Sequence, residues 1–261
     1  MYFDIVDIRS FYAERLGQVA RRLIAERLRK RWPSVAGESL LGIGFATPYL
    51  SDFSGEAERV LAFMPAAQGV TNWPPEGPNA AALVEDDSLP LSDSSIDRVI
   101  VIHSLEMAAD PGNQLREIWR VLAPGGRVIL VVPNRRGIWA RVETTPFGFG
   151  RPFGRGQLTT LLRDSMFSPL GWSEALAVPP IRHRPFLRSG RAWERVGAVF
   201  WPTFSGVIIV EATKQLYQGI PSRQPSRRSV RELRPAMRPV LLPPAATRSC
   251  RNCHETVAPF S

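Results

Sequence analysis

A histidine and a glutamate follow the most apolar run of the chain and could take part in acid–base chemistry. His103 comes directly after the β-branched run Ile96–Ile102, and Glu106 follows it closely. Such a run is typical of a strand buried on both faces of a sheet, which would place both side chains at a strand end. Histidine titrates near neutral pH, so His103 is the candidate catalytic base. The alternative is a histidine that only hydrogen-bonds within its loop.

A loop of arginines, aromatic residues, glycines and prolines follows the next apolar run, Val128–Val132. Arginine and aromatic side chains in residues 134–156 could hold an anionic or planar small-molecule substrate. The alternative is a lid that packs through its aromatic rings while its arginines stay in water. The candidate substrate-binding residues are Glu106, Trp139, Arg141, Phe147 and Arg151.

Strands and helices that could position these residues alternate along the chain. The expected strands are Ser39–Gly44, Arg59–Phe63, Ala80–Val84, Ile96–Ile102, Val128–Val132, Trp172–Val178 and Gly206–Thr213. The expected helices are Ile8–Arg31, Pro48–Phe53, a helix that starts at Pro111 and stops before Pro124, Gln157–Phe167 and Arg188–Phe200. This alternation predicts an α/β fold in which helices cover both faces of a mainly parallel sheet.

Composition divides the chain into three parts. We expect an N-terminal helix in residues 1–34, a folded domain in 35–218 and a disordered Pro/Arg-rich tail in 219–261. The tail holds eight arginines against two glutamates, so it carries +6 of the net charge of +9. It could attract an acidic partner electrostatically. No aromatic residues alternate with its arginines, so specific nucleic-acid recognition is not expected.

The sequence predicts neither a membrane span nor a metal site. No apolar run approaches the roughly 18 residues that a span needs. The first residues lack the basic and apolar regions of a secretory signal, so a cytoplasmic location is expected. Cys250 and Cys253 both lie in the tail, where Cys250-Arg251-Asn252-Cys253-His254 matches a haem-attachment pattern or a zinc half-site. We interpret the pair as accidental.

Two segments resemble one protein family. Glu85-Asp86-Asp87-Ser88-Leu89-Pro90-Leu91-Ser92-Asp93-Ser94-Ser95-Ile96-Asp97 is similar to the stretch before the fourth strand of S-adenosylmethionine (SAM)-dependent methyltransferases of the type 11 group. Leu115-Arg116-Glu117-Ile118-Trp119-Arg120-Val121-Leu122-Ala123-Pro124-Gly125-Gly126 looks like the helix and turn that follow in that family. The resemblance implies a class I methyltransferase fold, which is a doubly wound, seven-stranded Rossmann-like sheet with an antiparallel final strand. It also implies SAM as cofactor and a small-molecule methyl acceptor.

The resemblance also implies where the cofactor would bind. In an open parallel sheet a ligand lies at the carboxyl ends of the strands, near the switch in strand order. A carboxylate after the third strand would accept the adenine amino group, and the end of the fourth strand would border the transferred methyl group. The corresponding positions are Gly42, Gly44, Ala46, Met64, Glu85, Asp86 and His103.

Three of these positions depart from the family pattern, and one of them is Ala46, which replaces a glycine of the turn after the first strand. Gly42 stands where the family has an acidic residue for the cofactor's ammonium group, and Met64 where a carboxylate takes the ribose hydroxyls. Each missing charge-assisted hydrogen bond is worth about 1.5–3 kcal/mol, so SAM binding could be weaker by roughly two to four decades. An alternative function is therefore a catalytically inactive relative that serves as a binding or regulatory module. A nicotinamide-dependent Rossmann enzyme is a third hypothesis, but Gly42-Ile43-Gly44-Phe45-Ala46-Thr47 lacks its last glycine.

Overall fold

The computed structural model describes residues 4–177, 179–180 and 205–216. All of them belong to the unit Met1–Gly219. The tail 219–261 and the predicted helix Arg188–Phe200 lie outside the described residues. Within the described part, no helix is both long enough and apolar enough to cross a membrane.

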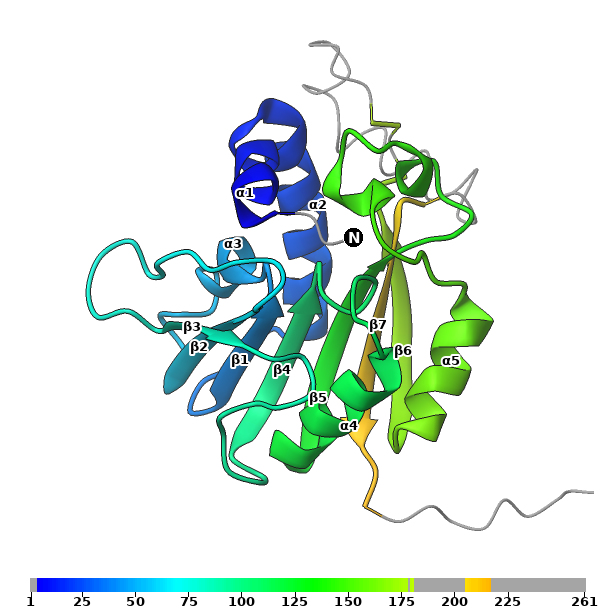
Figure 1. Ribbon diagram of the computed structural model, residues 1–261. Helices are drawn as coiled ribbons and strands as arrows, with labels where there is room; N and C mark the ends of the chain where they lie inside the picture. Colours follow the sequence, from blue (N-terminus) through cyan, green and yellow to red (C-terminus); the bar gives the residue numbers. More distant parts are fainter. Residues whose placement is uncertain (1–3, 178, 181–204, 217–261) are drawn as a thin grey trace, which may run out of the picture. The chain divides into compact units, whose positions relative to one another are not determined.

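Seven strands form a single sheet in the order β3-β2-β1-β4-β5-β7-β6 (Figure 1). β1 to β5 pair in parallel, whereas β7 is antiparallel to both of its neighbours, β5 and β6. This confirms the predicted doubly wound, mainly parallel sheet with an antiparallel final strand. The strands are β1 Ser39–Gly44, β2 Arg59–Pro65, β3 Ala81–Val84, β4 Ile96–Ile102, β5 Leu122–Pro133, β6 Phe167–Ala175 and β7 Val207–Lys214.

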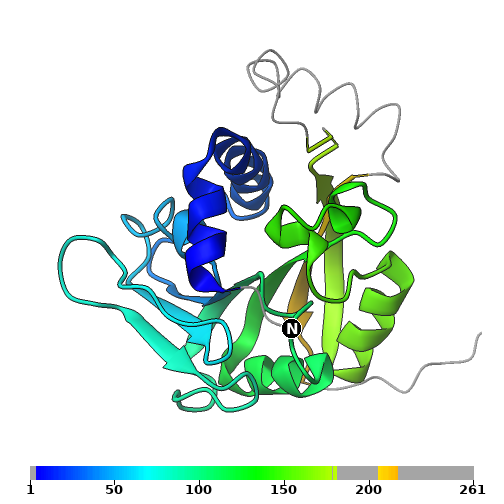
Figure 2. The ribbon, with the colours of Figure 1, turned by 45° about the horizontal axis from the view of Figure 1, so that its top comes forward.

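Helices cover both faces of the sheet (Figure 2). One face packs against α4 and α5, and the opposite face packs against α1, α2 and α3. Successive residues of a strand point to opposite faces, so each strand contributes side chains to both cores. Along β4, for example, Ile100 and Ile102 enter the core under α1–α3, whereas Val99 and Val101 enter the core under α4 and α5. The helices are α1 Ile5–Ala13, α2 Arg15–Arg31, α3 Thr47–Leu50, α4 Pro111–Val121 and α5 Arg155–Asp164, with 3-10 turns η1 Trp139–Arg141 and η2 Pro146–Gly148.

The prediction of one N-terminal helix over Ile8–Arg31 was wrong. The segment forms two helices that separate at Glu14, whose backbone is extended at φ −74° and ψ 159°. Gly17 lies so close to the Phe11 carbonyl oxygen that a Cβ atom there would collide with it. A continuous apolar periodicity does not reveal such a break, because both helices bury the same kind of face. The break allows α1 to leave the direction of α2 and to reach the carboxyl ends of the strands (Figure 1).

Glu117 and Arg120 of α4 hold the loop that follows β3. Glu117 Oε1 accepts a hydrogen bond from the Leu89 amide at 2.8 Å, and Arg120 Nη1 donates to the Leu91 carbonyl at 2.9 Å. The hydrogen bonds from Arg120 lower the pKa of the Glu117 carboxyl, so it stays ionised. These two residues therefore support the sheet edge where Glu85 and Asp86 lie.

Candidate functional site

His103 stands at the carboxyl end of β4 in a left-handed backbone conformation, with φ of 54°. Its ring is 1% exposed, and its Nε2 is hydrogen-bonded to the Tyr12 hydroxyl at 2.8 Å. The His103 carbonyl accepts a bond from Gln68 Nε2 at 2.9 Å. Left-handed backbone is uncommon outside glycine and clusters at functional sites. The strand end therefore places the imidazole in a fixed position inside the protein.

Glu106 is buried beside this histidine. Its Oε1 lies 3.5 Å from His103 Nδ1, and neither carboxylate oxygen has a hydrogen-bond partner in the described part of the chain. Its backbone carbonyl accepts a bond from the Arg151 amide at 2.7 Å, which holds the loop over it. A buried carboxylate without partners is costly. Glu106 is thus a group that a ligand, a water or a proton would satisfy.

Other unpartnered polar atoms gather around the same strand end. Gln68 and Gln114 each leave a buried Oε1 without a partner, although Gln68 bonds the His103 carbonyl and Gln114 Nε2 bonds the Ser104 hydroxyl. Five of the seven such atoms among the described residues belong to Gln68, His103, Glu106 and Gln114. Native interiors contain few such atoms, and each calls for an unseen partner. Their concentration here marks the end of β4 as the candidate functional site.

Helix α1 lies directly over this site. The Tyr12 hydroxyl is hydrogen-bonded to the Tyr49 hydroxyl at 2.9 Å as well as to His103. The Tyr12 ring stacks on the Phe45 ring, with the two centroids 5.5 Å apart. Phe147 packs against His103 at 4.8 Å and against Phe11 at 6.2 Å. We call Phe11, Tyr12, Phe45, Tyr49 and Phe147 the aromatic cap. The cap fills the space above the turn after β1 and excludes water from His103.

The turn after β1 is shaped by close packing. Gly44 has φ of 78°, and a Cβ there would collide with the Ile102 carbonyl oxygen of β4. At Gly42 a Cβ would lie 2.6 Å from Leu50 Cδ1 and 2.7 Å from the Ala46 Cβ. Ala46 is helical, with φ of −85°. An acidic side chain at position 42 therefore has no room, because α3 occupies the space that it would need.

The end of β2 holds α1. Met64 is fully buried, and the Thr71 amide donates to its sulfur at 3.3 Å. The Gln68 carbonyl accepts a bond from the Ile5 amide at 2.9 Å, at the start of α1. On the next strand, Asp86 is half-buried and its Oδ1 accepts from Gln114 Nε2 at 3.0 Å. Among the candidate cofactor positions, only the end of β3 supplies carboxylates, from Asp86 and the exposed Glu85.

The candidate substrate residues separate into buried and exposed groups. Glu106, Trp139 and Phe147 are buried, and the rings of Trp139 and Phe147 meet edge to face at 5.4 Å. Arg141 and Arg151 are exposed. The loop thus uses its aromatic residues for packing and brings Phe147 to His103.

Sequence reasoning missed four residues of this site: Tyr12, Tyr49, Gln68 and Gln114. Tyr12 and Gln114 lie on the apolar faces of amphipathic helices, where a buried position is expected for core residues. Tyr12 meets His103 across 91 residues of sequence, and Gln114 meets Ser104 across 10. A glutamine among apolar helix positions was the one local signal that pointed to Gln114.

The buried tyrosines should make stability sensitive to alkaline pH. Burial raises the pKa of both Tyr12 and Tyr49 above 10.0, and Glu106 adds to the effect on Tyr12. The unfolded chain therefore loses phenolic protons first, and the free energy of unfolding should fall as pH rises above about 10. In Tyr12→Phe the fall should be shallower by about 1.4 kcal/mol per pH unit, measured by urea unfolding across that range. Burial lowers the pKa of Lys214, which also titrates at alkaline pH. Its contribution to the slope is the same in both proteins and cancels in the comparison. The same pH dependence of the free energy of unfolding in Tyr12→Phe and the wild type would contradict the prediction that Tyr12 causes part of the fall.

The strand order defines the class I methyltransferase fold, as predicted. Residues 41–130 match the Methyltransf_11 family model, which describes a methyltransferase domain. This match covers both of the segments that carried the resemblance, from the first strand to the fifth.

Solved structures agree on the fold. A chain from the complex of the Haloferax volcanii Trm112 methyltransferase activator with its putative methyltransferase is 16% identical with a TM-score of 0.58, over 82% of this chain and 100% of that chain. A Thermotoga maritima SAM-dependent methyltransferase, described as a possible histamine N-methyltransferase, is 16% identical with a TM-score of 0.51, over 77% and 92%. The [4+2]-cyclase SpnF is 21% identical with a TM-score of 0.51, over 77% and 82%. No curated protein matches the chain in sequence.

Proposed function

We propose that the chain is a SAM-dependent methyltransferase that acts on a small molecule. The observation that carries this proposal is the group of unpartnered buried polar atoms on Gln68, His103, Glu106 and Gln114. They lie at the carboxyl end of β4 in a methyltransferase sheet, where an open parallel sheet binds its ligand. The family match over residues 41–130 supports the same function. A cyclase also has this fold, so the site and not the fold must carry the argument.

In this conformation the candidate cofactor residues offer a partner for the adenine of SAM, but none for its ammonium group or its ribose. Asp86, with Gln114 bonded to it, can accept the adenine amino group at the end of β3. Gly42 and Met64 offer no carboxylate for the ammonium group or the ribose hydroxyls, and the aromatic cap occupies the space above them. Binding of the whole cofactor therefore requires α1 to move away from His103, which breaks the Tyr12 bonds to His103 and Tyr49.

His103 and Glu106 are proposed to assist the acceptor. Bound SAM supplies an electrophilic methyl group, and a hydroxyl acceptor must lose its proton as it attacks. His103 Nε2 can take that proton once Tyr12 has left it. Glu106, 3.5 Å from Nδ1, would stabilise the imidazolium that results.

A catalytically inactive binding module is the second candidate. The packing of Leu50 and Ala46 against Gly42 favours it, because the space for the missing acidic side chain has been filled by core residues. In that case the site would bind a ligand other than SAM, and the buried polar atoms would serve that ligand.

Calorimetric titration of the full chain with SAM and with S-adenosylhomocysteine separates the two candidates. The enzyme proposal expects binding of both, with Kd values in the range of about 10 µM to 1 mM because the two charged anchors are absent. Asp86→Asn should weaken binding about tenfold, since a charged acceptor becomes neutral. Asp87→Asn is the matched control, because Asp87 is exposed, and it should leave the Kd unchanged. Absence of binding at millimolar ligand would exclude the methyltransferase and favour the module.

A further inference from the structure

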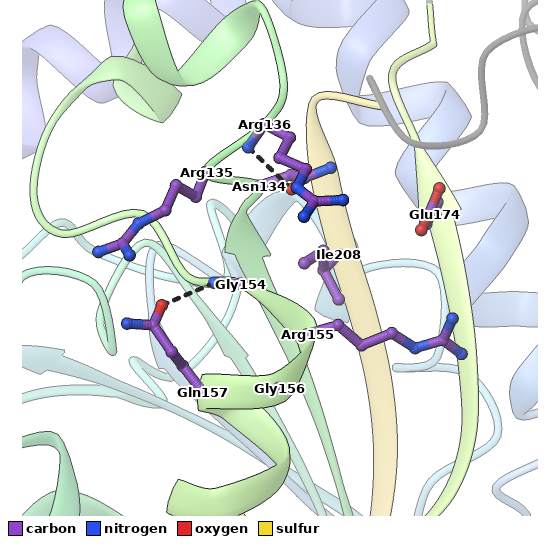
Figure 3. A pocket seen from close by; sticks show the side chains of 9 residues that line it. All are labelled: Asn134, Arg135, Arg136, Gly154, Arg155, Gly156, Gln157, Glu174 and Ile208. Atoms are coloured by element: carbon purple, nitrogen blue, oxygen red, sulfur yellow. Dashed lines mark hydrogen bonds between the residues drawn. The ribbon is translucent and has the colours of Figure 1, made fainter.

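A cavity of about 670 Å³ opens where β5 ends and α5 begins. Arg135 and Arg136 line it from the segment after β5, Arg155 and Gln157 from the first turn of α5, and Glu174 from β6 (Figure 3). We call this cavity the arginine pocket. It is separate from the aromatic cap, and none of its lining residues belongs to the cofactor or catalytic candidates.

The arginine pocket is lined by more positive than negative charges. Arg135 and Arg136 are exposed and form no ion pair within the described part of the chain. The Arg155 guanidinium stacks over the Trp172 ring at 4.9 Å. Glu174, the one carboxylate of the lining, accepts a bond from the Ser205 hydroxyl at 2.9 Å. Three cations against one anion leave an excess of two positive charges in a concave site, which attracts anions.

The backbone that carries these arginines is held in place. Asn134 accepts a bond from the Arg136 amide at 3.1 Å, and its Nδ2 donates to the Ser205 carbonyl at 2.9 Å. The Arg135 amide donates to the Phe153 carbonyl at 3.0 Å. The backbone of both arginines is therefore fixed, so less conformational freedom of the main chain is lost when a ligand binds.

The arginines approach the pocket from different sides. In Figure 3, Arg136 and Arg155 extend on the side of Ile208 and Glu174, whereas the Arg135 guanidinium is directed away from them, on the side of Gln157. Guanidinium groups offer paired N–H donors whose spacing matches two oxygens of one anion. Donors on several sides suit a tetrahedral anion with three free oxygens better than a flat carboxylate.

We propose that the arginine pocket binds the phosphate group of a phosphorylated small molecule. A phosphate monoester carries close to two negative charges at neutral pH, which neutralise the excess charge of the lining. Its oxygens accept from Arg136, which follows β5, and from Arg155 in the first turn of α5, and Arg135 adds positive charge to the lining. This site is independent of the proposed methyl transfer and remains whether or not the chain binds SAM.

The test is a calorimetric titration of the full chain with inorganic phosphate and with glycerol 3-phosphate in low-salt buffer. We expect a Kd of about 1 mM or lower for the ester. Arg136→Gln and Arg155→Gln should each weaken binding about tenfold, because each removes a charge-assisted donor pair. The matched control is Arg163→Gln, an exposed arginine at the far end of α5, which should change the Kd by less than about twofold.

Three results would overturn the proposal. One is no heat of binding for either phosphate compound. Another is an equal loss of affinity in Arg163→Gln and Arg136→Gln, which would mean a diffuse attraction by net charge. The third is succinate binding as tightly as glycerol 3-phosphate, because a carboxylate pocket would then be the correct assignment. Circular dichroism of each variant checks that the exposed substitutions leave the fold intact.

Discussion

Gly42→Asp, which introduces the acidic residue expected from the resemblance to methyltransferases, should destabilise the protein by about 3–5 kcal/mol. The new Cβ would lie 2.6 Å from Leu50 Cδ1 and 2.7 Å from Ala46 Cβ, so α3 would have to move. The carboxylate would also be buried among apolar side chains without a partner. Urea unfolding followed by circular dichroism measures the loss.

Gly42→Ala separates the two causes of this loss. It adds the same Cβ without a charge, so it should cost about 1–3 kcal/mol by overpacking alone. The double variant Gly42→Asp with Leu50→Ala should lose less stability than the two single variants lose together, because shortening Leu50 makes room for the new side chain. A Gly42→Asp protein as stable as the wild type, with tighter S-adenosylhomocysteine binding, would mean that the acidic site is still open.

Gly44→Ala should destabilise the protein by about 3 kcal/mol or more, through two causes that act together. The position has φ of 78°, where a side chain costs energy, and a Cβ would collide with the Ile102 carbonyl oxygen. That oxygen accepts the Phe45 amide at 3.0 Å, so a shift would also strain the link between the β1 turn and β4. Chemical denaturation again gives the free energy of unfolding.

Gly125→Ala is the matched control for Gly44→Ala. Gly125 has the same φ of 78°, and no atom lies within 4 Å of the Cβ position. Its substitution should cost only the conformational energy, about 1–2 kcal/mol. If Gly125→Ala were as destabilising as Gly44→Ala, the close approach of β1 to β4 would not be what requires glycine at position 44.

The strands and helices could be predicted because the residue patterns that mark them lie within each element. The strand Ile96–Ile102 and the proline at the first position of α4 match the structure at their starting residues. Strand β5 begins at Leu122, earlier than the predicted Val128, because Pro124-Gly125-Gly126 continues the strand after the helix ends. A Pro-Gly-Gly sequence usually ends an element, and only pairing with β4 reveals that the chain stays extended.

The site could be predicted only at its strand ends. His103 and Glu106 follow an obvious strand, so their neighbourhood could be inferred. The approach of Tyr12 could not, since it depends on the break at Glu14 and on the close packing at Gly17. The sequence indicated that arginines of residues 134–156 could hold an anionic ligand, but not that they line one pocket with the first turn of α5. Arg135 and Arg155 come together only because the Arg135 amide bonds the Phe153 carbonyl just before α5 begins.

The placement of β7 between β5 and β6 has a consequence for biosynthesis. β6 pairs only with β7 in the sheet, and β7 fills the side of β5 opposite β4. A ribosome that has made the chain only as far as residue 206 therefore leaves a hydrophobic edge of β5 open and β6 unpaired. The sheet closes when the segment Val207–Lys214 inserts between two strands already made, a late and non-local step that is slow in folding. Until that moment the nascent chain exposes an aggregation-prone edge.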